Sequence, residues 1–117
     1  MSADLPICAV LGSGTMGAQI ALSLALGGAS VRLWGRRAEA LDPALARCGE
    51  GFDFLATSGL VDAEARDDVL GEITVTGYLA GAVENAGFVI EAVAEDLEVK
   101  QALLVEAEAL APSDIIT

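Results

Sequence analysis

Short apolar runs recur along the chain at intervals that are typical of an α/β protein. The run at residues 7–11 follows a proline, precedes a glycine cluster and contains only apolar residues. A continuous apolar run of this length predicts a strand that is buried on both faces. Further runs that are mainly apolar or β-branched predict four more strands, at residues 31–34, 73–75, 88–90 and 114–117.

Longer segments with helical spacing of apolar residues separate these strands. The two segments that precede the third strand are joined at Gly59 and predict an antiparallel helical hairpin. Gly49 and Gly51 are expected to weaken the first helix of that hairpin, because glycine is a poor helix former. The predicted helices cover residues 15–26, 38–56, 62–70 and 78–85 and the segment between Asp96 and Pro112.

Strands and helices that alternate in this way predict one fold class. Consecutive parallel strands need right-handed crossovers, and helices then cover both faces of the sheet. We therefore expect an α/β fold: a Rossmann-type doubly wound parallel sheet with the strand order 3-2-1-4-5 and the helical hairpin as an insertion. Residues 1–117 would form one dinucleotide-binding domain. Because the sequence stops at the fifth predicted strand, we expect a fragment of a longer enzyme, with a carboxy-terminal helical domain absent from this chain.

Composition restricts the partners that such a domain can have. Eighteen acidic residues against six basic ones, with no histidine, give a net charge of −12. The resulting field repels nucleic acid and anionic membranes, so we expect neither as a partner. Cys8 and Cys48 lack the spacing of a metal site or a redox pair, and we interpret both as reduced structural thiols with no metal. The start of the chain has no basic leader region, and we expect a cytoplasmic protein.

The glycine cluster after the first strand carries the clearest chemical signal. Its spacing matches the dinucleotide fingerprint, in which the first glycine allows a tight turn, the second admits a pyrophosphate and the third lets the helix pack closely. The N–H groups and partial positive charge of the helix start would hold the phosphates without a basic side chain. A plain strand-to-helix corner is the alternative. The predicted cofactor-binding residues of this turn are Gly12, Ser13, Gly14, Thr15, Met16 and Gly17.

Two stretches make the chain similar to a known family. Residues 12–21, GSGTMGAQIA, and residues 89–100, VIEAVAEDLEVK, resemble 3-hydroxyacyl-CoA dehydrogenases and their relatives, which include lambda-crystallin and the gulonate dehydrogenase type. The second stretch is the more specific, because a Glu-Ala-Val-x-Glu-x-Leu-x-x-Lys run after the fourth strand is not a general Rossmann feature. The helical hairpin also fits, and the resemblance covers essentially the whole chain.

The resemblance implies a nicotinamide-dependent enzyme that transfers a hydride between its cofactor and a secondary alcohol, with a 3-hydroxyacyl-CoA as the first substrate class. Ala94, Glu95 and Lys100 would lie beside the nicotinamide half of the cofactor, although an ordinary helix start would also explain them. The family's proton shuttle, a histidine paired with a glutamate, is expected beyond Thr117. No catalytic residue is therefore predicted here, and we expect the chain alone to be inactive. The full-length enzyme would be a homodimer.

The turn after the second strand departs from the pattern of NAD-specific members. In those members an aspartate ends the strand and accepts hydrogen bonds from the adenosine ribose, whereas this chain has Gly35, Arg36 and Arg37. A carboxylate would repel a 2′-phosphate, and an arginine can bind one through two charge-assisted hydrogen bonds. We therefore expect NADP in preference to NAD. Two solvated arginines, with the ribose bound by backbone groups, are the alternative.

The hairpin departs from the pattern as well, because the acyl-CoA enzymes use it to help hold CoA. Residues 38–72 contain nine acidic residues and only two arginines, Arg47 and Arg66, which is a poor composition for a site that binds the CoA phosphates. A smaller hydroxy acid, as in gulonate or carnitine dehydrogenases, is therefore a competing substrate. A solvated hairpin that binds no ligand is a further alternative.

A non-enzymatic dinucleotide sensor is the alternative to an oxidoreductase, since the fold alone does not separate the two.

Overall fold

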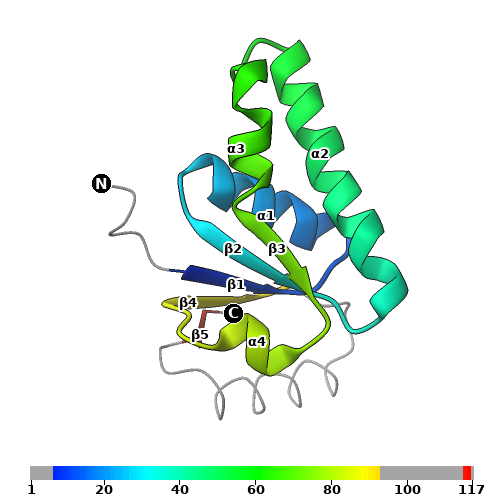
Figure 1. Ribbon diagram of the computed structural model, residues 1–117, viewed down its shortest axis with the longest axis vertical. Coiled ribbons are helices and arrows are strands. Elements are labelled where there is room, and N and C mark those ends of the chain that lie inside the picture. The colour runs from blue at the N-terminus through cyan, green and yellow to red at the C-terminus, as the bar shows by residue number, and fades with distance from the viewer. Residues whose placement is uncertain (1–6, 93–114, 117) are drawn as a thin grey trace.

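The computed structural model describes residues 7–92 and 115–116, which form one parallel sheet with helices on both faces (Figure 1). The strands follow the order β3-β2-β1-β4-β5, and each neighbouring pair is parallel. The doubly wound order expected from the sequence is therefore confirmed. The strands are β1 (Ile7–Leu11), β2 (Ser30–Trp34), β3 (Ile73–Thr76), β4 (Phe88–Glu91) and β5 (Ile115–Ile116).

The register of the strands brings their carboxyl ends to one edge of the sheet. Leu11, the last residue of β1, lies beside Trp34 at the end of β2 and beside Glu91 at the end of β4. Trp34 in turn lies beside Thr76, the last residue of β3. The segments that leave these four strands therefore start next to one another, at the edge where open α/β sheets bind ligands.

The helices agree with the predicted ones in the first half of the chain and are shorter afterwards. The helix expected at residues 78–85 begins only after Tyr78, its N-cap, and has ended before Asn85, whose φ of 58° lies in the left-handed region. The helix expected between Asp96 and Pro112 lies outside the described residues. The described helices are α1 (Thr15–Leu26), η2 (Ala38–Ala40), α2 (Leu41–Thr57), η3 (Ala63–Ala65), α3 (Arg66–Leu70) and α4 (Leu79–Val83).

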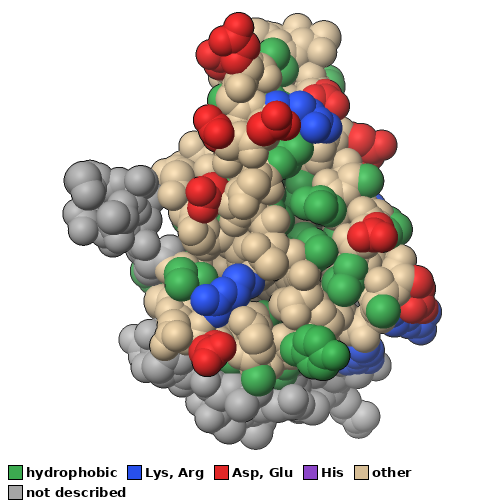
Figure 2. Space-filling model, viewed as in Figure 1, with side chains coloured by type: hydrophobic (Ala, Val, Ile, Leu, Met, Phe, Trp, Pro, Cys, Tyr) green, Lys and Arg blue, Asp and Glu red, His purple; other side chains and the backbone are tan. Residues whose placement is uncertain are grey.

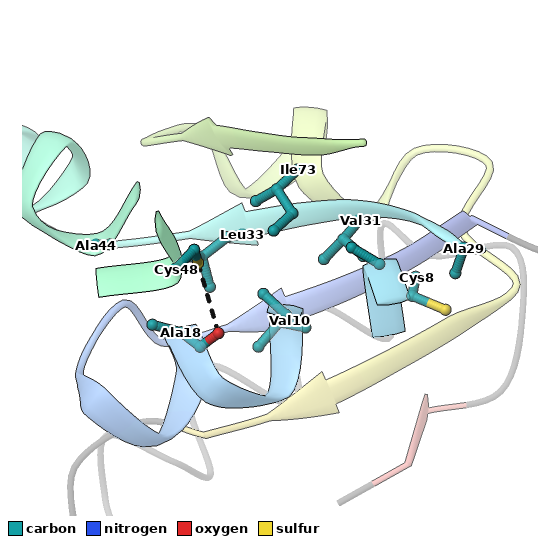
Figure 3. Packing of buried hydrophobic residues seen from close by; sticks show 11 residues of the cluster. Cys8, Val10, Ala18, Ala29, Val31, Leu33, Ala44, Cys48 and Ile73 are labelled. Atoms are coloured by element: carbon teal, nitrogen blue, oxygen red, sulfur yellow. Dashed lines mark hydrogen bonds between the residues drawn. The ribbon is translucent and has the colours of Figure 1, made fainter. Parts of the chain in front are cut away.

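Alternate residues of β1 belong to two separate cores, one on each face of the sheet. Cys8 and Val10 pack with β2 residues, with three alanines of α1 and with residues of α2 (Figure 3). Ala9 and Leu11 pack with Trp34 and with the buried residues of α4. A strand with both faces buried needs apolar residues at every position, which explains why the run has no alternating polar residue.

The helical hairpin of α2 and α3 extends beyond the sheet (Figure 1). Arg66 of α3 forms an exposed ion pair with Asp53 of α2, with 2.8 Å between Nε and Oδ1. The two glycines that were expected to weaken α2 lie inside an unbroken helix. A Cβ on Gly49 would lie 2.8 Å from Nη2 of Arg66, and one on Gly51 would lie 2.9 Å from a methyl group of Leu22. These glycines therefore let α2 pack closely against its neighbours.

Both cysteines are buried and reduced, as the sequence predicts. Burial raises the pKa of the Cys8 thiol and of the Cys48 thiol above the usual value, so both favour the protonated form. Among residues 7–92 and 115–116, no helix combines the length and the apolar character that crossing a membrane would require.

Phe52 and Phe54 on α2 provide a matched test of this packing. The Phe52 side chain is 0% exposed, whereas Phe54 is 71% exposed. Phe52→Ala should lower the free energy of unfolding by about 3–5 kcal/mol, because it removes buried apolar area and leaves a cavity. Phe54→Ala should change it by less than about 0.5 kcal/mol. Urea denaturation of both variants measures the difference, and equal losses would show that the described packing of α2 is wrong.

Candidate dinucleotide-binding site

The turn from β1 to α1 requires glycine at two of its three glycine positions. Gly12 has a φ of 134°, a region that strongly favours glycine, and its N–H donates to the Trp34 carbonyl at 2.8 Å. A Cβ on Gly17 would lie 1.8 Å from the Gly12 carbonyl oxygen. That oxygen belongs to the backbone of the turn and cannot rotate away. The first turn of α1 therefore packs directly on the end of β1.

Gly14 lies in the same turn, but the fold does not require a glycine there. Its φ of −73° and ψ of −169° are extended values that any residue can adopt. A Cβ on Gly14 would meet no described atom within 4 Å. Gly14 caps α1 without a side-chain hydrogen bond, and the first turn contains no acidic residue. Open space thus lies in front of a helix start whose N–H groups can bind an anion.

Gly35, which follows β2, lies against the glycine turn. It is buried, and its N–H donates to the Thr76 carbonyl at 3.1 Å. A Cβ on Gly35 would lie 2.6 Å from Oγ of Ser13 and 2.8 Å from its Cβ. The structure therefore brings together two segments that the sequence placed in one site, the turn of residues 12–17 and the end of β2.

Arg47 is a residue of this corner that the sequence analysis missed. It lies on α2, and its Nη1 donates to the carbonyl oxygen of Ser13 at 3.2 Å. The guanidinium group is exposed, so its other donors remain available to a ligand. No local motif marks Arg47, because only the packing of α2 on α1 brings it to the turn.

The arginines near the turn form no ion pair with an acidic residue that the structure describes. Arg66–Asp53 is the single ion pair between two residues that the structure describes, and Arg32 donates to the carbonyl groups of Gly81 and Glu84. No described carboxylate lies within ion-pair distance of Arg36, Arg37 or Arg47. Figure 2 shows basic side chains at the lower right of the molecule, beside the first turns of α2. In a chain with a net charge of −12, cations at one corner that pair with no described carboxylate favour an anionic ligand there.

A buried contact holds α2 in the position that Arg47 needs. The Cys48 thiol, which follows Arg47, donates to the Ala18 carbonyl with 3.5 Å between sulfur and oxygen (Figure 3). Ala44, one turn earlier on α2, is 0% exposed. Cys48 is therefore a structural residue. Separately, within the described ranges no group of three acidic or cysteine side chains could hold a metal ion.

Three of the predicted cofactor-binding residues cannot be placed. Ala94, Glu95 and Lys100 lie outside the described residues. The described part of the same stretch ends with Glu91 and Ala92, and the Ala92 N–H donates to the Leu11 carbonyl at 2.8 Å. Ala92, the last described residue of this stretch, therefore lies beside the residue that precedes the glycine turn.

Known proteins share this sequence and this fold. The family model for the NAD-binding domain of 3-hydroxyacyl-CoA dehydrogenase matches residues 7–117. A 3-hydroxyadipyl-CoA dehydrogenase of Escherichia coli K12 is 40% identical over 119 aligned residues, covering 100% of this chain. The structure of a 3-hydroxybutyryl-CoA dehydrogenase from the same species matches 97% of the chain with a TM-score of 0.85 and 33% identity. The structure of a diketoreductase matches 95% of it with a TM-score of 0.85 and 34% identity.

This chain spans only part of each relative. It covers 25% of the 3-hydroxyadipyl-CoA dehydrogenase, 25% of the 3-hydroxybutyryl-CoA dehydrogenase and 40% of the diketoreductase. The family match includes both the glycine turn and the stretch after β4. The chain belongs to the family of NAD-binding domains of 3-hydroxyacyl-CoA dehydrogenases.

Proposed function

We propose that this chain binds a nicotinamide dinucleotide by its pyrophosphate at the turn of residues 12–17 and serves as the cofactor-binding domain of an oxidoreductase. The observation that carries the proposal is the space at Gly14, where a side chain would meet no described atom within 4 Å. The fold alone would accept a larger residue there. A ligand that approaches the backbone explains the glycine, and the helix start supplies the N–H donors that a pyrophosphate needs.

When bound, the nicotinamide ring supplies hydride transfer to or from the carbon of a secondary alcohol. The domain's own residues would bind and orient the cofactor: Gly12 and Gly17 fix the turn, and Ala94, Glu95 and Lys100 would lie beside the nicotinamide half. The family resemblance implies a histidine paired with a glutamate as the acid–base group; this chain contains no histidine, so that group would come from another part of the enzyme. A homodimeric full-length enzyme and a cytoplasmic location stay predictions.

A 3-hydroxyacyl-CoA is the first substrate class, supported by relatives named as dehydrogenases of 3-hydroxyadipyl-CoA and 3-hydroxybutyryl-CoA. A smaller hydroxy acid or ketone is the second, supported by the charges of the hairpin. Asp53 neutralises Arg66, and Arg47 reaches away from the hairpin to Ser13. The hairpin thus offers CoA phosphates many carboxylates and no other described cation. The diketoreductase relative is named for dicarbonyl compounds, which carry no such phosphates.

We further propose that the site prefers NADP. Gly35 replaces the carboxylate that would accept hydrogen bonds from the ribose of NAD. Arg36 and Arg37 follow it, both exposed and without a described acidic partner, and Arg47 reaches the same corner through Ser13. A dianionic 2′-phosphate would find guanidinium groups there that form no ion pair with a described carboxylate.

The space at Gly14 is tested by filling it. Gly14→Val should leave the chain folded, with a small loss of stability because valine is a poorer helix N-cap than glycine. It should weaken the binding of NAD and NADP by roughly 10- to 100-fold or more, because it displaces a phosphate that accepts charge-assisted hydrogen bonds. Gly27→Val, at the far end of α1, is the matched control and should leave both affinities unchanged. Calorimetric titration provides the measurement. Undiminished affinity in Gly14→Val, with the control also intact, would count against the pyrophosphate site.

The division of roles between binding and chemistry is tested with the chain of 117 residues itself. It should bind the cofactor in a titration yet form no reduced cofactor when 3-hydroxybutyryl-CoA and the oxidised dinucleotide are supplied together. The reason is that the histidine–glutamate pair implied by the family resemblance would be needed to accept the hydroxyl proton, and this chain has no histidine. Turnover that follows the concentration of purified chain would contradict this division.

Cofactor preference is tested at Arg36. The unmodified chain should bind NADP more tightly than NAD by roughly tenfold or more at low salt, and the ratio should shrink as salt screens the charges. Arg36→Ala should remove most of the preference by weakening NADP alone. Arg66→Ala, which removes an arginine paired with Asp53 on the hairpin, is the control and should keep the ratio. A chain that prefers NAD, with a ratio insensitive to Arg36→Ala, would show that the arginines are ordinary surface residues.

A further inference from the structure

Arg47 of α2 contacts the glycine turn at a backbone oxygen. Its Nη1 donates to the Ser13 carbonyl oxygen at 3.2 Å. A peptide group is planar, and in the trans form its carbonyl and its N–H point in opposite directions. No cis peptide bond occurs in the described part of the chain. The Gly14 N–H belongs to the same peptide group as the Ser13 carbonyl, so it points away from the guanidinium group of Arg47.

The Gly14 N–H is a donor that the turn itself does not use. It donates to no carbonyl group of the described residues. Gly14 is exposed, and a Cβ on it would meet no described atom within 4 Å. A backbone donor beside open space at a helix start is suited to an oxygen of a pyrophosphate.

Hydrogen bonds of the backbone hold the residues on either side of this peptide group but not the group itself. The Gly12 N–H donates to the Trp34 carbonyl at 2.8 Å, and the Gly14 carbonyl accepts from the Ala18 N–H at 3.0 Å. Among the described donors, only Arg47 donates to the Ser13 carbonyl. Glycine at position 14 would otherwise let the peptide group rotate, because a residue without Cβ tolerates a wide range of φ.

We propose that Arg47 is a positioning residue of the cofactor site, an inference that rests on the proposed dinucleotide function. Its hydrogen bond holds the peptide group between Ser13 and Gly14 in the orientation that directs the Gly14 N–H toward the pyrophosphate. The charged guanidinium group also polarises this peptide group, which makes the N–H a stronger donor. Arg47 therefore contributes to binding through the backbone of the turn, without touching the phosphates.

The inference is tested by titrating three variants of the chain with NAD and with NADP. Arg47→Ala should weaken the binding of both by the same factor, roughly 2- to 10-fold, because the two cofactors share the pyrophosphate. Arg47→Lys should recover most of the affinity, since an ammonium group can donate to the same carbonyl. Arg66→Ala, which removes an equal charge from the hairpin, is the matched control and should leave both affinities unchanged.

NMR of the ligand-free chains provides a signature that a general loss of stability would not produce. The carbonyl carbon signal of Ser13 and the amide nitrogen signal of Gly14 should move in Arg47→Ala, because both atoms belong to the peptide group that loses its hydrogen bond. Both signals should return toward their original positions in Arg47→Lys. The amide signals around Gly59, at the far end of the hairpin, should stay in place in both variants.

Unchanged affinity for both dinucleotides in Arg47→Ala would overturn the inference, and so would a loss of affinity without movement of the Ser13 and Gly14 signals. A loss confined to NADP that shrinks as salt is added would also overturn it, because Arg47 would then bind the 2′-phosphate directly. A wild-type chain that binds neither dinucleotide would instead refute the proposed function before any variant is made. Calorimetry of the wild-type chain therefore distinguishes the two failures.

Discussion

The close approach of Gly17 to the Gly12 carbonyl is the contact on which the rest of the site depends. Any Cβ at position 17 would lie 1.8 Å from that oxygen, so the helix can start this near the strand only when the residue is glycine. The approach fixes the direction of α1 relative to β1 and leaves Gly14 at the exposed helix start. It also restrains Ser13, which lies between the two fixed glycines and touches the end of β2.

The site resolves an electrostatic conflict between an acidic protein and an anionic ligand. A net charge of −12 repels a pyrophosphate at long range. Backbone N–H groups at the start of α1 provide donors that do not depend on side-chain charge. Under the proposed preference for NADP, Arg36, Arg37 and Arg47 would add local positive charge where the ribose binds, while Asp53 pairs with Arg66 on the hairpin. The groups that would attract an anionic ligand thus lie at the edge of the sheet where the strands end.

Most of the fold could be predicted from the sequence, because local patterns determine it. The apolar run of β1, the glycine spacing and the alternation of elements give the parallel sheet in its observed order. Two features of the site could not be predicted. The contact of Arg47 with Ser13 joins residues 34 positions apart, and the crowding of Gly35 by Ser13 depends on the register of β1 and β2. The packing at the glycines of α2 could not be predicted for the same reason, since a helix propensity takes no account of what packs against the helix.

Backbone amide NMR of the intact chain during titration with NADP would test most directly whether the phosphates bind at the glycine turn. The amide signals of Gly14, Thr15 and Met16 should move in proportion to saturation, because their N–H groups would donate to the pyrophosphate. Amides of the hairpin tip around Gly59 should stay in place. Saturable shifts that leave the turn untouched, or no shifts at millimolar NADP, would show that these glycines form only a strand-to-helix corner.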